Sequence, residues 1–228
     1  MSQNNVKRNY FLTDGKLSQF IAKFYSVLER DLSDLIPYGM SQSKIDMLRA
    51  KCISFTKIDF DIYSIGVQMI ATDNKNTLMT RLQESIRQMN WRAESKWGTD
   101  ASEYQKLGAE NISLQPEDSL LRISRNMYDL MTAYLPELSD FGLTETILED
   151  FQNLTNEFEA AITAKNNAIV QRKADKKKRI QMGNELYREL AIYCDIGKKL
   201  YAKTNPAKYY NYVIYDKPSK GRIDVPID

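Results

Sequence analysis

Apolar residues recur at helical spacing along most of the chain. The first series lies three, four and seven positions apart, at Leu17, Phe20, Ile21, Phe24, Leu28, Leu32 and Leu35. Side chains at this spacing share one face of a helix, so the series predicts an amphipathic helix. Thr13 or Asp14 can cap its start, and Pro37 and Gly39 are expected to end it.

Two more helices are expected in the first half. Ser41 can cap a helix whose apolar positions are Ile45, Leu48, Cys52, Phe55, Ile62, Ile65 and Met69. The polar residues 71–76 then predict a turn, although a solvated stretch of one long helix fits them too. A third series follows at Leu78, Leu82, Ile86, Met89 and Trp97. Gly98 is expected to close that helix.

The second half follows the same plan. Its first apolar series is Leu120, Ile123, Met127, Leu130, Met131, Leu135 and Leu138. Thr144 can cap the next helix, which contains Leu148, Phe151, Phe158 and Ile162. Residues 171–179 are polar and predict a second turn, again with continuous helix as the alternative. The pattern resumes at Ile180, Leu186, Leu190, Tyr193 and Leu200.

The two halves also match residue by residue. Shifting residues 20–71 forward by 103 positions superposes Tyr25 on Tyr128, Leu32 on Leu135, Leu35 on Leu138, Gly39 on Gly142 and Phe55 on Phe158. A repeat of this length is typical of one supersecondary unit used twice. The sequence therefore predicts an all-α fold, an elongated helical bundle of two pseudo-repeated three-helix units.

The predicted organisation has three parts packed as one compact domain. Residues 1–117 form the first repeat with its connection, residues 118–203 form the second repeat, and residues 204–228 form a Tyr-rich arm. Within the arm, residues 209–215 are aromatic and β-branched, residues 217–221 have turn chemistry, and apolar residues alternate beyond them. A short β-like hairpin is expected there. Two strands alone are marginally stable in water, so the hairpin needs another surface to pack on.

Composition adds limits on the class of protein. Apolar residues make up 43% and charged residues 27% of the chain, which is typical of a folded globular protein, and the net charge is only +2. No general attraction to nucleic acid or to a membrane follows from that charge. No segment has the roughly 18 apolar residues of a membrane span, and the two cysteines lack disulfide or zinc spacing. We expect a soluble, cytoplasmic protein without a membrane partner, or one that ends in a virion or other large assembly.

Catalytic signatures are missing from the sequence. It contains no histidine, which removes the commonest general base and zinc ligand, and its single glycines form no phosphate-binding loop. We therefore expect no enzyme activity and no cofactor. An acidic stretch contains Asp140, Glu145, Glu149, Asp150, Glu157 and Glu159. The solvated face of a helix explains it, with a carboxylate metal or acid–base site as the alternative.

One basic run is the strongest local charge feature. It contains Arg172, Lys173, Lys176, Lys177, Lys178 and Arg179. Such a run can bind phosphates, and it predicts a polyanion site as an alternative function. The structural interpretation is a solvated stretch, or a complement to the acidic helix before it.

Tyrosine is concentrated near the carboxyl terminus. Seven of the fourteen tyrosines lie between residues 187 and 215. Tyrosine suits protein interfaces, although packing of the arm onto its own bundle uses the same property. The candidate partner-binding residues are Tyr209, Tyr210, Tyr212, Tyr215, Ile223 and Val225.

The repeated turn carries a family resemblance. Residues 38–41 (Tyr-Gly-Met-Ser) and 141–144 (Phe-Gly-Leu-Thr) each lie between two apolar helical series. With the flanking residues 20–71 and 123–174, they resemble uncharacterised all-helical repeat proteins of Bacteroidetes and their phages. The resemblance implies a helical fold and assigns no functional residue.

These observations favour a non-enzymatic structural or adaptor subunit. It would bind protein subunits as a homo- or hetero-oligomer within a larger assembly, of which a phage virion is one example. A nucleic-acid-associated protein that uses residues 172–179 is the first alternative. A helical-bundle enzyme with a carboxylate metal site is the second.

Overall fold

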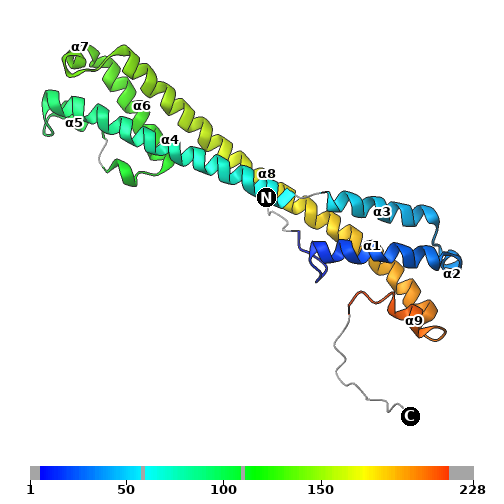
Figure 1. The fold of residues 1–228 in the computed structure, drawn as a ribbon. Coiled ribbons are helices and arrows are strands. Elements are labelled where there is room, and N and C mark those ends of the chain that lie inside the picture. Colours follow the sequence, from blue (N-terminus) through cyan, green and yellow to red (C-terminus); the bar gives the residue numbers. More distant parts are fainter. Residues whose placement is uncertain (1–5, 58–59, 109–110, 216–228) are drawn as a thin grey trace, which may run out of the picture. The chain divides into compact units, whose positions relative to one another are not determined.

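The structure is a computed structural model that describes residues 6–57, 60–108 and 111–215. All regular elements in these ranges are helical, which confirms the all-α class. The long helices are α1 (Asp14–Arg30), α3 (Gln42–Thr56), α4 (Phe60–Trp97), α6 (Glu117–Ala133) and α8 (Glu145–Tyr201) (Figure 1). The short ones are α2 (Leu32–Leu35), α5 (Ser102–Gln105), α7 (Leu135–Leu138) and α9 (Pro206–Tyr210). Single 3-10 turns form η1 (Ile36–Tyr38), η2 (Ile112–Leu114) and η3 (Ser139–Phe141).

Three helices begin at the predicted capping residues. The hydroxyl of Thr13 accepts a hydrogen bond of 3.2 Å from the backbone N–H three residues on, at the start of α1. Ser41 does the same for α3 at 3.4 Å, and Thr144 for α8 at 3.3 Å. Each hydroxyl satisfies a backbone donor that has no partner within its helix.

The corner after the first helix has the same local structure in both halves. Gly39 and Gly142 follow a 3-10 turn with φ of +82° and +77°, a left-handed conformation that glycine adopts without steric cost. The next residue, Met40 or Leu143, is buried and donates to the carbonyl five residues back. The bounds of α6, α7 and η3 are those of α1, α2 and η1 plus 103.

The two predicted turns are wrong, and the continuous helix is found instead. Residues 71–76 lie within α4, and residues 171–179 lie within α8. In the first stretch Asp73 and Asn74 are exposed, and the hydroxyls of Thr72 and Thr77 donate to backbone carbonyls four residues back. Polar residues of this stretch thus mostly face solvent, and the buried one, Lys75, pairs with Glu117 at 3.0 Å. Gly98 ends α4 as predicted, with φ of +78°.

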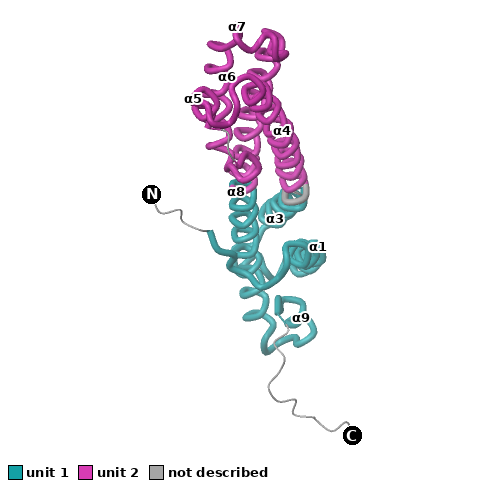
Figure 2. The backbone as a smooth tube through the Cα atoms, turned by 90° about the vertical axis from the view of Figure 1, so that its left-hand side faces the viewer, with its two compact units in different colours: residues 1–60, 174–228 teal, residues 61–173 magenta. Residues whose placement is uncertain are grey.

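The described chain divides into two compact units (Figure 2). Unit 1 comprises residues 1–60 and 174–228, and unit 2 comprises residues 61–173. This division differs from the predicted one, which placed boundaries after residues 117 and 203 and expected one compact domain. Unit 1 therefore consists of two segments that are far apart in the sequence.

Unit 1 is a three-helix bundle of α1, α3 and the last part of α8. Its buried core comprises Tyr10, Leu17, Ile21, Phe24, Tyr25, Leu28, Leu35, Met40, Ile45, Leu48, Cys52, Phe55, Leu186, Leu190, Cys194, Tyr201 and Tyr212. The predicted apolar series of α1 and α3 therefore supply most of this core. Met69 of the second predicted series is 60% exposed, and Ile62 lies outside the side chains that the structure describes.

Unit 2 is a three-helix bundle of α4, α6 and the first part of α8. Its buried core comprises Leu78, Leu82, Ile86, Met89, Ala93, Leu107, Ile112, Leu120, Ile123, Met127, Met131, Leu138, Leu143, Leu148, Phe151, Phe158 and Ala161. Each unit therefore combines one helical hairpin with a third helix that precedes or follows it in the chain.

Candidate functional site

The chain after α8 folds back onto unit 1 as a short helix and turn. Asn205 caps α9 by accepting a hydrogen bond of 3.0 Å from the backbone N–H of Lys208. The predicted strand over residues 209–215 is therefore wrong at its start, since Pro206–Tyr210 is helical. The second predicted strand, with Ile223 and Val225, lies outside the described residues. We call residues 205–215 the docked segment.

Tyr212 anchors the docked segment in the core of unit 1. Its side chain is fully buried, and its ring meets Phe24 edge-on with 5.4 Å between ring centroids. The ring lies directly against the backbone of Gly197 in α8, where any Cβ atom would overlap it. The absence of a side chain at Gly197 therefore creates the space that Tyr212 fills.

A buried carboxylate receives the polar end of Tyr212. Asp31, at the end of α1, has a fully buried side chain and accepts the Tyr212 hydroxyl at 3.0 Å. The same carboxylate pairs with Lys208 Nζ at 2.8 Å and with the Arg30 guanidinium at 2.7 Å. Burial alone raises the pKa of Asp31, but these three donors outweigh it and lower that pKa to about 2.

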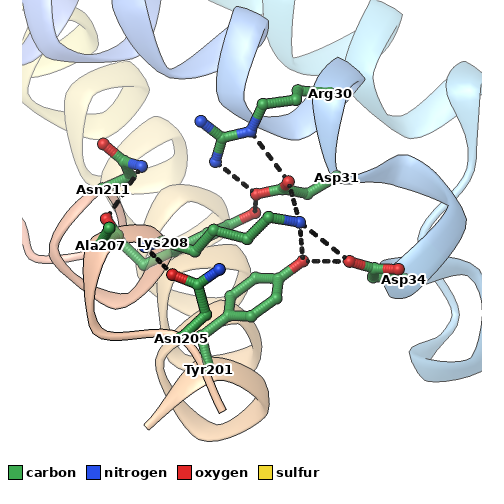
Figure 3. A network of polar contacts seen from close by, with 9 residues as sticks. Arg30, Asp31, Asp34, Tyr201, Asn205, Ala207, Lys208 and Asn211 are labelled. Carbon is green, nitrogen blue, oxygen red and sulfur yellow. Dashed lines mark hydrogen bonds and ion pairs between the residues drawn. The ribbon is translucent and has the colours of Figure 1, made fainter.

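A second carboxylate extends the network toward solvent. Asp34 accepts hydrogen bonds from the Tyr201 hydroxyl at 2.7 Å and from Lys208 Nζ at 3.1 Å, as Figure 3 shows. The hydrogen bond from Tyr201, together with Lys208, lowers the pKa of Asp34. Lys208 thus bridges both carboxylates, and its pKa is raised chiefly by its hydrogen bond to Asp31. The docked segment carries a cation into a site that holds two anions.

Among the described residues of unit 2, two aromatic rings lie where the predicted repeat would place the Asp31 network. A shift of 103 residues takes Asp31 to Tyr134. Pairing the buried residues Leu82 and Ile86 of α4 with Leu186 and Leu190 of α8 takes Tyr201 to Trp97. Those two aromatic rings contact each other edge-on in unit 2, with 4.9 Å between centroids. The segment after α4 also packs on the bundle of unit 2, but it does so through the buried apolar side chains of Leu107 and Ile112.

The end of the docked segment borders an aromatic surface of unit 1. The Tyr215 ring lies 6.3 Å from the rings of both Tyr187 and Phe11, measured between centroids. Its hydroxyl also accepts a hydrogen bond of 3.1 Å from the backbone N–H of Phe11. Phe11 itself is 96% exposed. Phe11 thus presents an almost fully exposed ring beside Tyr215.

An open groove continues from this aromatic surface along α8. It has a volume of about 580 Å³ and is lined by residues that include Asn9, Tyr187, Arg188, Ala191, Ile192 and Asp195. Ile192 is 52% exposed on the face of α8 opposite the core. Asn184 fixes one wall, because its side chain donates to the carbonyl of Lys7 and accepts from the N–H of Asn9. We use the name aromatic groove for this groove together with the adjacent rings of Phe11, Tyr187 and Tyr215.

The predicted tyrosines have different environments. Tyr212 is buried, and Tyr209 packs partly against the core of unit 1. Tyr210 is 70% exposed, and Tyr215 is part of the aromatic groove. Sequence reasoning missed Phe11 and Ile192. Both are apolar residues that fall outside every helical series, and that mismatch was the available signal.

The basic run is partly used within the fold. Arg172 donates to the side-chain carbonyl of Gln68 at 3.0 Å in unit 2, and Arg179 pairs with Asp14 at 3.2 Å in unit 1. Lys173, Lys176 and Lys177 are exposed on α8. The run crosses the division between the two units, which falls after residue 173. The part that remains accessible is therefore mainly lysine.

The acidic stretch faces solvent. Glu145, Glu149 and Asp150 are exposed on α8. Glu159 pairs with Arg125 at 2.7 Å, and Glu157 approaches Arg81 at 3.9 Å. Within the described ranges, carboxylate and cysteine side chains do not gather into a group of three that could hold a metal ion.

Both cysteines belong to the core of unit 1. Cys52 and Cys194 are buried, as the apolar series predicts for Cys52. Burial raises the pKa of Cys194 to about 12, so its thiol is protonated at neutral pH.

No protein-family model, curated protein or solved structure matches the chain. Among the described helices, none combines the length and apolar character needed to cross a lipid bilayer.

Proposed function

We propose that the chain is a non-enzymatic structural or adaptor subunit that binds a protein partner through the aromatic groove of unit 1. The observation that carries this proposal is Phe11, a side chain 96% exposed that packs edge-on against Tyr215. Exposed aromatic residues beside an open groove are the usual anchors of protein interfaces.

The chemistry of the groove favours a polypeptide as the ligand. Apolar surface from Ala191 and Ile192 lies beside the charged groups of Arg188 and Asp195. An apolar centre with a charged edge matches the mixed surface of a protein segment, whose side chains supply both kinds of contact. The partner that we propose is a protein subunit, either a second copy of this chain or a different chain.

We infer that the fold contains two pseudo-repeated three-helix units that have exchanged their third helices. The matched corners and helix bounds support the repeat. A further match is electrostatic: Lys75 of α4 pairs with Glu117 at the start of α6, and Arg179 of α8 pairs with Asp14 at the start of α1. In each case the third helix neutralises the first acidic residue of a hairpin that lies elsewhere in the sequence.

A multi-subunit assembly is the setting that we propose for this adaptor. The resemblance of residues 20–71 and 123–174 to helical repeat proteins of Bacteroidetes and their phages makes a virion one such assembly. An accessible groove on a bundle with a tightly packed core suits a subunit that connects others.

A photo-crosslinking experiment tests the groove. A photoreactive residue is placed at Ile192 in the full chain, in the cells that naturally produce it, and adducts are identified by mass spectrometry. The matched control places the residue at Leu114, which is 83% exposed in unit 2. We expect a specific protein adduct at position 192 that Phe11→Asp abolishes. The same adducts at both positions would overturn the proposal.

One observation favours a second candidate function, polyanion binding. Lys173, Lys176 and Lys177 are exposed and lie three and four residues apart, so they share one side of α8. A protein that neutralises three phosphates loses affinity with salt at a log–log slope of about 3. Titration of duplex DNA into the full chain, with and without Glu at all three positions, tests this function. An unchanged slope would rule it out.

A further inference from the structure

The docked segment of unit 1 differs in chemistry from the segment that follows α4 in unit 2, which packs through the apolar side chains of Leu107 and Ile112. In unit 2 the place of Asp31 is taken by Tyr134, which packs on Trp97. In unit 1 the corresponding space holds the Tyr212 ring, a buried carboxylate and a lysine from the docked segment. Where unit 2 has Tyr134 packed on Trp97, unit 1 has a polar socket that another part of the chain occupies.

The socket recognises specific chemistry. Gly197 admits an aromatic ring against the helix backbone, and Phe24 supplies an apolar wall. Asp31 accepts a hydroxyl and an ammonium group at the same time. In the docked segment these groups come from Lys208 in α9 and from Tyr212, two residues beyond the end of α9. The ligand class is therefore a short segment with the pattern Lys-x-x-x-Tyr whose first part is helical.

The connection between α8 and the docked segment is short and lacks proline. Residues 202–204 form the link, and the N–H groups of Thr204 and Asn205 both donate to the carbonyl of Tyr201. The first proline after α8 is Pro206, so the residues of the link permit α8 to extend through it. Such an extension would carry the docked segment away from its own unit. All the socket contacts of Lys208 and Tyr212 would form unchanged in the same socket of another copy.

We propose that the Asp31–Gly197 socket binds the docked segment of a second copy of the chain as well as its own, so that two copies associate by exchanging residues 205–212. Within one chain the link keeps the segment at a high effective concentration, and this intramolecular competition favours the closed form in dilute solution. A dimer is expected to form only when this intramolecular competition is removed.

A complementation experiment with two full-length variants removes it. Gly197→Leu blocks the socket but leaves the segment intact, whereas Tyr212→Ala removes the anchor but leaves the socket open. We expect each variant alone to remain monomeric by light scattering. An equimolar mixture is expected to form a one-to-one dimer, because the segment of the first variant enters the socket of the second. A mixture that stays monomeric would overturn the exchange.

A peptide experiment keeps the test valid if Gly197→Leu misfolds. A synthetic peptide of residues 204–215 is titrated into the Tyr212→Ala chain by calorimetry, beside control peptides carrying Tyr212→Ala or Lys208→Ala. We expect each control to bind at least about tenfold more weakly, since each lacks one partner of the buried carboxylate. Equal binding of all three peptides would show that the socket has no such specificity. Specific peptide binding without dimer formation would refute exchange between chains.

Discussion

Arg179 forms an ion pair with Asp14, in which Nε and Oδ2 are 3.2 Å apart. The two side chains are only 19% and 23% exposed, so solvent screens the pair less than a surface pair. Arg179 belongs to the basic run, yet it stabilises the first turn of α1, where an acidic residue also interacts favourably with the helix dipole. At least one member of the run thus has a structural role.

Removing this pair is expected to destabilise unit 1. Arg179→Gln should lower the free energy of unfolding by about 1 kcal/mol, because Asp14 then loses a partly buried partner. Lys177→Gln is the matched control, since Lys177 is exposed on the same helix and should change stability by less than about 0.5 kcal/mol. Urea unfolding followed by circular dichroism measures both. Equal effects would contradict a structural role for Arg179.

Two glycines in long helices should respond in opposite directions to alanine. Gly197→Ala places a Cβ atom against the Tyr212 ring and should cost about 1–3 kcal/mol of stability. Gly66→Ala meets no atom within 4 Å in α4 and should gain up to about 1 kcal/mol, because alanine favours helix. Thermal unfolding of the two variants beside the unsubstituted chain measures the difference. A stabilising Gly197→Ala would mean that the ring does not lie on this glycine.

The buried carboxylate predicts a dependence of stability on pH. The pKa of Asp31 is lowered from 3.8 to about 2 in the folded chain, so its interactions stabilise the folded state above pH 3.8. That contribution is lost as pH falls from about 4 to about 2. With Asp31→Asn, the midpoint temperature of unfolding should depend less on pH across this window. The substitution should also lower stability at neutral pH. An unchanged slope in the variant would exclude Asp31 as a source of acid sensitivity.

The continuity of α4 predicts sensitivity to proline. Asn74 is exposed, so Asn74→Pro changes little except the backbone, where it removes a hydrogen bond and adds a steric clash. We expect a loss of about 3 kcal/mol, against less than about 1 kcal/mol for the control Asn74→Ala. Chemical denaturation separates the two variants. Tolerance of proline at this position would restore the turn that the polar sequence first suggested.

Local features of the fold were predictable from the sequence because their causes are local. Ser41 and Thr144 cap helices since their hydroxyls reach a backbone N–H only three residues away. Gly39 adopts a left-handed conformation that few other residues tolerate. Apolar spacing identified the core of α1 and α3 for the same reason, since it depends on positions within one helix.

Features that depend on distant contacts were not predictable. The bond between Tyr212 and Asp31 joins residues 181 positions apart, and neither position alone indicates a socket. The aromatic composition of residues 209–215 favoured a strand, but the cap by Asn205 and packing on Gly197 favoured a helical turn. Polar residues in α4 were mistaken for a turn because a solvated helical face and a turn have similar composition.

The discontinuity of unit 1 has a consequence for synthesis. Unit 2 is complete once residue 173 has left the ribosome, whereas unit 1 needs core residues from Leu17 to Tyr212. The hairpin of α1 and α3 is made first, yet its apolar face must wait until α8 and Tyr212 have emerged. The first helices translated are therefore the last to be enclosed, and during that interval they are the part of the nascent chain most in need of a chaperone.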